Sequence, residues 1–167
     1  MPKRILELIA VSLVLTACAK IRNEPWPARI ESISGFSGEE ETNVRSALAD
    51  LNESGGKTTL ILDGAPARAF PITILKRDPP ADAPNRAGLS TLDESHCTIE
   101  ISSKVFSPGY STYMKSVVWH EIGHCGGLVH TGQVGALMYP TTAPFVDYTN
   151  YELGDFFAAL FSSALLK

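Results

Sequence analysis

Three histidines in one short segment constrain this chain more than any other feature of its sequence. His120 and His124 stand four residues apart, and His130 follows six residues later. Four residues turn a helix by about 400°, so the first two imidazoles would lie one turn apart on one face. A continuous helix would carry His130 about 15 Å along the axis from His120, beyond reach. Because Gly126 and Gly127 allow the helix to end, we predict that the chain turns back and brings the third imidazole to the other two.

Three imidazoles at this spacing predict a zinc site. Catalytic zinc usually takes three protein ligands and leaves one position for water, whereas structural zinc takes four. We therefore predict that Zn²⁺ is bound by His120, His124 and His130. Glu121 projects about 100° away from His120 around the helix, so it can flank the metal without binding it. Its predicted role is that of a general base.

The wider segment carries a family resemblance. From His120 to His130 it reads H-E-x-x-H-x-x-G-x-x-H, and Leu137-Met138-Tyr139-Pro140 follows. The first motif resembles that of the metzincin metalloproteases, and the second resembles their Met-turn. The eighteen residues from His120 to Met138 are most similar to the spacing in the matrixin branch. The resemblance implies that Met138 forms an apolar floor beneath the zinc and does not bind it.

The rest of the chain predicts an α+β fold. Ser37 and Glu40 have capping-box spacing, so we expect a helix over 38–53. Ser111 or Thr112 is expected to cap the histidine-bearing helix, which should run to about Gly126. β-rich or alternating runs predict strands over 30–36, 58–62, 70–76, 89–92 and 97–102. By resemblance to the metzincins, these elements form a twisted mixed sheet with a zinc-binding helix and a Met-turn. A second capping pattern, Thr149-x-x-Glu152, predicts a C-terminal helix.

The N-terminus has the pattern of an export signal. Lys3 and Arg4 precede an apolar stretch that is shorter than the roughly twenty residues of a membrane span. Leu15-Thr16-Ala17-Cys18 resembles the lipobox of bacterial lipoproteins. The resemblance implies cleavage before Cys18 and acylation of Cys18. An ordinary secretory signal with an incidental cysteine is the alternative.

These predictions divide the chain into a signal peptide (1–17), a lipidated tether (18–28) and a metzincin-like catalytic domain (29–167). We expect a lipid-anchored protein of the bacterial cell envelope. The residue after Cys18 is Ala19 and not aspartate. By resemblance to the lipoproteins of Gram-negative bacteria, this favours the outer membrane if the source has one.

The two remaining cysteines are expected to pair. Cys125 lies about 140° around the helix from His120 and therefore points away from the metal. Lipidation of Cys18 would leave Cys97 and Cys125 as the two thiols of an exported, oxidised protein. We predict a Cys97–Cys125 disulfide, and two separate buried thiols are the alternative. The fourth histidine, His96, is expected at the surface or at a strand edge.

The implied activity is zinc-dependent hydrolysis of peptide bonds in a protein or peptide substrate. By resemblance, the substrate lies extended along an edge strand at Leu89–Leu92. The chain has 14 basic and 18 acidic side chains, so it lacks the positive charge of a nucleic-acid-binding protein. We expect a monomer. The alternatives are a non-catalytic zinc-containing surface binder or adhesin and a zinc amidase acting on cell-wall peptides. Glu121 argues against the binder, because a structural zinc needs a fourth ligand and no base.

The lipid anchor gives the first testable prediction. Wild-type protein, produced in a bacterial host that processes lipoproteins, should partition into the detergent phase, because two or more acyl chains give stable anchoring. Cys18→Ser should partition into the aqueous phase, while a Cys97→Ser control should behave as wild type. Recovery of the wild type in the aqueous phase would contradict the prediction.

Overall fold

The computed structural model describes residues 28–55, 60–63, 69–141 and 153–158. The predicted signal peptide, its Cys18 and the Thr149-x-x-Glu152 capping pattern lie outside these ranges. Within the described residues, no helix has both the length and the apolar character that a membrane span requires.

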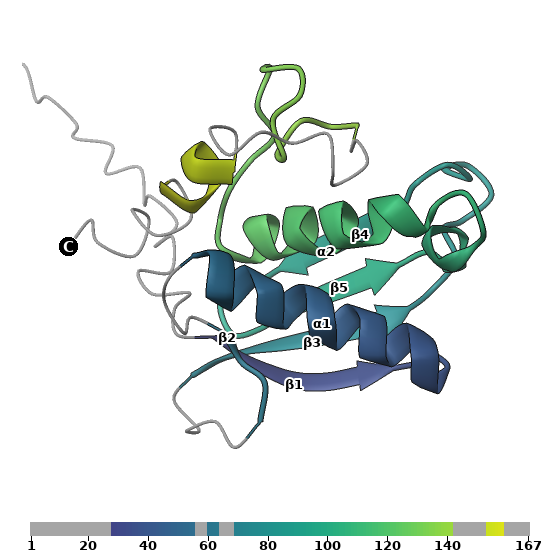
Figure 1. Cartoon of the computed structure of the whole chain (residues 1–167), viewed down its shortest axis with the longest axis horizontal. Helices are drawn as coiled ribbons and strands as arrows, with labels where there is room; N and C mark the ends of the chain where they lie inside the picture. The colour runs from purple at the N-terminus through teal and green to yellow at the C-terminus, as the bar shows by residue number, and fades with distance from the viewer. Residues whose placement is uncertain (1–27, 56–59, 64–68, 142–152, 159–167) are drawn as a thin grey trace, which may run out of the picture.

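The described strands form a single sheet whose order is β2-β1-β3-β5-β4 (Figure 1). Their bounds are Ala28–Ser34 for β1, Leu60–Ile61 for β2, Phe70–Lys76 for β3, Gly88–Leu92 for β4 and Cys97–Ile101 for β5. Four strands run parallel, and β4 pairs antiparallel with β5 at one end of the sheet. The predicted strand at Leu89–Leu92 is therefore an edge strand. Ala28, assigned to the tether from the sequence, is fully buried as the first residue of β1.

Two long helices lie side by side on one face of the sheet (Figure 1). They are α1 (Gly38–Ser54) and α2 (Ser111–Cys125), with a short 3₁₀ helix η1 (Ser103–Phe106) before the second. Residues 153–158 are helical too. Strands connected through helices that cover one face of the sheet give the predicted α+β fold.

The two helices begin in different ways. The predicted capping box opens α1, because Ser37 Oγ accepts from the amide of Glu40 and the Glu40 carboxylate accepts from the amide of Ser37. The predicted cap of α2 is wrong. Tyr110 occupies the cap position without a side-chain hydrogen bond, and Ser111 is already helical. Tyr110 has a near-helical backbone (φ −115°, ψ −4°), so the turn before it leads directly into α2.

The core lies between the sheet and the two helices. Cys97, Ile99 and Ile101 alternate inward along β5, as their spacing predicts, and each is fully buried. α1 contributes Val44, Ala47, Leu48 and Leu51 to the same core. Full burial of a leucine or isoleucine side chain stabilises a fold by about 1.5–3 kcal/mol, so this layer holds α1 and α2 against the sheet.

Trp119 fixes α2 between its neighbours. Its indole Nε1 donates to the carbonyl of Ala47 in α1 at 2.7 Å, which satisfies the polar atom of a fully buried ring. The ring also stacks on Phe156 and meets Phe157 edge to face. The residue before His120 is therefore held by both α1 and the helical segment at 153–158.

The predicted disulfide joins Cys97 to Cys125. It connects the first residue of β5 to the last residue of α2, with Cα atoms 5.7 Å apart. Both side chains are buried in the core, and Cys125 is the neighbour of His124. The bond therefore ties the C-terminal end of α2 to the sheet.

Loss of the disulfide should destabilise the fold. Its sequence separation of 28 residues corresponds to about 3–4 kcal/mol of lost chain entropy in the unfolded state. For a domain of this size that is roughly 10 °C in Tm. Dithiothreitol should lower the Tm of the wild type by this amount and leave that of Cys97→Ala/Cys125→Ala unchanged. If Cys97 and Cys125 both reacted as free thiols in the denatured, unreduced wild type, the pairing would be contradicted.

Candidate metal centre

The three predicted histidines converge on one point. His120 Nε2 lies 3.1 Å from His124 Nε2 and 3.2 Å from His130 Nε2, and the remaining pair is also 3.2 Å apart. His120 and His124 come from successive turns of α2, whereas His130 reaches them from the loop that follows. His120 is buried and His130 is exposed, so the cluster is open on one side.

A Schellman motif ends α2 and sends the chain back. Gly127 takes the left-handed conformation (φ +86°). The amide of Gly127 donates to the carbonyl of His124, and the amide of Leu128 donates to that of Gly123, each at 2.9 Å. This pair of hydrogen bonds defines the motif and favours glycine at the left-handed position. The predicted break at the glycines is confirmed, and it directs His130 back toward the helix.

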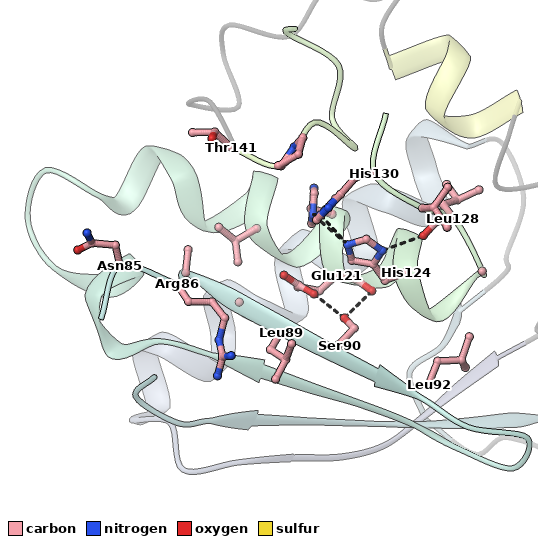
Figure 2. Close-up of a pocket in the computed structure, with 17 residues that line it drawn as sticks. Asn85, Arg86, Leu89, Ser90, Leu92, Glu121, His124, Leu128, His130 and Thr141 are labelled. Carbon is pink, nitrogen blue, oxygen red and sulfur yellow. Dashed lines mark hydrogen bonds between the residues drawn. The ribbon is translucent and has the colours of Figure 1, made fainter. Parts of the chain in front are cut away.

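Backbone carbonyls orient two of the imidazoles. His120 Nδ1 lies 2.6 Å from the carbonyl oxygen of Leu137, and His124 Nδ1 lies 2.8 Å from that of Leu128. Carbonyls only accept, so each Nδ1 carries the hydrogen and each Nε2 presents a lone pair. Figure 2 shows the His124–Leu128 contact and the imidazoles turned toward one another. This outer support of metal-binding histidines is common in metal sites.

The donor set fits a zinc ion. Imidazole nitrogens that share a tetrahedral zinc at 2.0–2.1 Å stand roughly 3.3 Å apart, close to the separations here. Without a cation, facing lone pairs at this distance would repel each other. Burial also lowers the pKa of His120 to about 4, so its ring is neutral and ready to bind a metal at neutral pH. In the described part of the chain, this is the one cluster of three or more His, Cys, Asp or Glu side chains with such geometry.

Met138 lies beneath α2. It is buried, and a Cβ added to Gly123 would stand 2.5 Å from Met138 Sδ and 3.0 Å from a ring carbon of Phe156. Gly123, the residue before His124, therefore leaves the space that the Met138 side chain occupies. The carbonyl of Met138 accepts from the amide of Thr131, next to His130. The turn around Met138 therefore supports both parts of the histidine cluster.

Glu121 points toward β4 and is almost fully buried. Ser90 Oγ lies 2.5 Å from the carboxylate Oε2 and 3.0 Å from the main-chain oxygen of the same residue (Figure 2). Burial raises the pKa of Glu121 to about 7, opposed by the Ser90 hydrogen bond and by the charge of Arg86. A bound dication would lower that pKa, since positive charge favours the carboxylate.

A cleft of about 720 Å³ opens over the histidines and Glu121. β4 forms one wall through Gly88, Ser90 and Leu92, and the loops after α2 form the other through Val129 and Pro140. Val129 is 80% exposed and Leu92 is 45% exposed. Apolar side chains at an open rim favour contact with an extended chain laid across the cleft.

Two groups of site residues escape prediction from the sequence. The Leu128 and Leu137 carbonyls carry no sequence signal, since every residue has a carbonyl. Ser90 and Gly88 are recognised only after the register of β4 is known. The remaining histidine, His96, lies outside the cluster. It is half-buried just before β5, and its Nε2 lies 2.9 Å from Oγ1 of Thr73 in the neighbouring strand β3.

Comparison with known sequences adds one match. A sequence model of the Matrixin family matches residues 38–155, from the first residue of α1 to the helical segment after the Met138 turn. No curated protein matches the chain. The matched range contains the three histidines, Glu121 and Met138.

Metal content tests the centre directly. The wild type should retain about one zinc per chain after dialysis, and zinc should raise its Tm, because the ion binds the folded state. His124→Ala and His130→Ala should each lose the metal, since each removes one of three ligands. His96→Ala is the matched control and should keep it. Full zinc content in His130→Ala, measured by mass spectrometry, would contradict the assignment.

Proposed function

The chain belongs to the matrixin family, and from that premise we propose that it is a zinc-dependent endopeptidase. His120, His124 and His130 would hold the metal, and Glu121 would be the general base. The observation that carries the proposal is the cluster of three imidazole nitrogens together with the buried Glu121 carboxylate, which lies on the same helix as His120 and His124. Three protein ligands leave a coordination position for water, as in catalytic zinc sites.

The residues divide the chemistry between them. When bound, zinc supplies Lewis acidity to the attacking water and to the scissile carbonyl. The Glu121 carboxylate accepts the proton of the water and then delivers it to the leaving nitrogen, so that the amine departs uncharged. Leu137 and Leu128 keep Nδ1 protonated on two imidazoles and so keep their Nε2 lone pairs directed at the metal. Met138 acts as an apolar support, since a thioether is a poor zinc ligand among imidazoles.

The substrate would bind as an extended peptide along β4. This strand ends the described sheet and lines the cleft. An extended peptide can add to a sheet edge through main-chain hydrogen bonds, with alternate side chains entering pockets. Leu92 and Val129 line the cleft beside that path, so apolar substrate side chains are favoured there.

The cellular setting follows from the N-terminal sequence. We propose that residues 1–17 are removed, that Cys18 is acylated, and that the protein is a monomer anchored to a membrane of the bacterial cell envelope. Residues 18–27 would then carry the catalytic domain away from the membrane surface. Two prolines around Trp26 favour an extended tether there.

Replacement of Glu121 separates metal binding from catalysis. Glu121→Gln and Glu121→Ala should keep about one zinc per chain, because all three histidines remain. Their kcat on a quenched peptide library should fall by about 10²–10⁴, as expected for loss of a general base. Glu39→Gln removes an exposed carboxylate in the first turn of α1 and should leave activity unchanged.

Substrate class is decided by giving the wild type three substrates: denatured proteins, peptides and purified peptidoglycan. Cleavage of peptidoglycan alone would favour the amidase. Zinc binding without cleavage of any of the three would favour the binder. Undiminished cleavage by Glu121→Ala would refute the proposed base.

A further inference from the structure

The register of β4 places two of its residues opposite Glu121. Gly88 pairs with Ile101 and Ser90 pairs with Ile99 across the antiparallel ladder. Residues directly opposite each other in such a ladder project to the same face. Because Ile99 and Ile101 are buried beneath the helices, Gly88 and Ser90 also face α2. The residues between and beyond them, Leu89 and Thr91, project to the other face.

Ser90 contacts Glu121 with its hydroxyl. Oγ lies within hydrogen-bonding distance of both the carboxylate and the main-chain oxygen of Glu121 (Figure 2). A hydroxyl has one hydrogen and donates to one acceptor at a time. The main-chain oxygen lies 3.0 Å away and already faces the amide four residues on in α2, whereas the carboxylate oxygen is nearer, at 2.5 Å. The hydroxyl therefore donates to the Glu121 side chain.

Gly88 leaves the space that this side chain fills. A Cβ at position 88 would stand 2.5 Å from Glu121 Oε1 and 2.8 Å from its Cγ. The backbone does not require glycine there, because the glycines with positive φ in the described chain are Gly35, Gly109, Gly127 and Gly135. Glycine is thus required for room and not for conformation. Any larger residue would push the carboxylate away from its present place.

We propose that Ser90 is a positioning residue for the reaction: its hydroxyl holds the Glu121 carboxylate beside the histidine cluster, in the space that Gly88 leaves open. The inference rests on the proposed function for its catalytic consequence. The contact itself does not depend on activity or on bound zinc, so it has a separate test.

A double-mutant cycle on the zinc-free protein tests the contact. Ser90→Ala should lower the Tm of the wild type by about 2–4 °C, the loss expected for one hydrogen bond of about 1 kcal/mol. In a Glu121→Ala background the same change should lower the Tm by clearly less, because the side-chain acceptor is gone. Equal losses in the two backgrounds would overturn the proposal, since the hydroxyl would then serve only the main-chain oxygen.

Kinetics test the consequence on the zinc-loaded protein. Ser90→Ala should keep its zinc and its KM but lose about tenfold or more in kcat, since misplacement by about 1 Å can cost 10²-fold. Ser90→Thr retains the hydroxyl and should recover kcat to within about threefold of wild type. Gly88→Ala should reduce kcat with zinc retained. Ser32→Ala removes an exposed hydroxyl of β1, bonded to Thr73 in the same sheet, and should leave kcat unchanged.

The outcomes separate the two proposals. Wild-type kcat in Ser90→Ala, or the same loss in Ser32→Ala as in Ser90→Ala, would overturn the positioning role while leaving the protease intact. A wild type that hydrolyses nothing would end the proposed function, and the Tm cycle would then decide alone whether Ser90 holds the carboxylate.

Discussion

The mutual approach of three imidazole nitrogens is the interaction on which the site depends. Lone pairs at 3.1–3.2 Å repel one another, so the arrangement needs either a shared cation or strong external restraint. The chain supplies restraint through carbonyls at Nδ1 of His120 and His124. The ion would then bind nitrogens that already point at it, so that little ordering of the side chains opposes binding.

The packing of α2 in the core holds those nitrogens in place. α2 is fixed along its length by Trp119 against α1 and at its C-terminal end by the Cys97–Cys125 disulfide. The helix then ends at Cys125, one residue after its second histidine, and Gly127 turns the chain back. The Met138 turn returns beneath the helix through close contact with Gly123. A helix that could slide or fray here would misalign His124. These tertiary restraints lie within a few residues of the ligands.

Sequence reasoning succeeded where a local pattern has one structural meaning. Ser37 with Glu40 predicts the start of α1, alternation predicts the inward face of β5, and the histidine spacing with two glycines predicts the cluster. It failed at Tyr110, where a preceding turn replaces the polar cap, and it missed η1. Ser90 and Gly88 could not be assigned to the site from the sequence. Their position opposite Glu121 depends on how β4 pairs with β5, and Ser90 is separated from Glu121 by 31 residues in the chain. Long-range pairing of this kind leaves no mark in a local pattern.

The edge position of β4 connects the base to the proposed substrate path. One side of β4 pairs with β5, and the other ends the described sheet. Alternation along the strand turns Ser90 toward Glu121 while the backbone remains free to run beside an added peptide. A small displacement of β4 would therefore move the peptide and the Ser90 hydroxyl together. The three histidines that would hold the metal lie on α2 and the loop after it, so such a displacement would also move the peptide relative to the metal. The packing of β4 against α2 through Ser90 and Glu121 therefore keeps the peptide, the base and the metal in one arrangement.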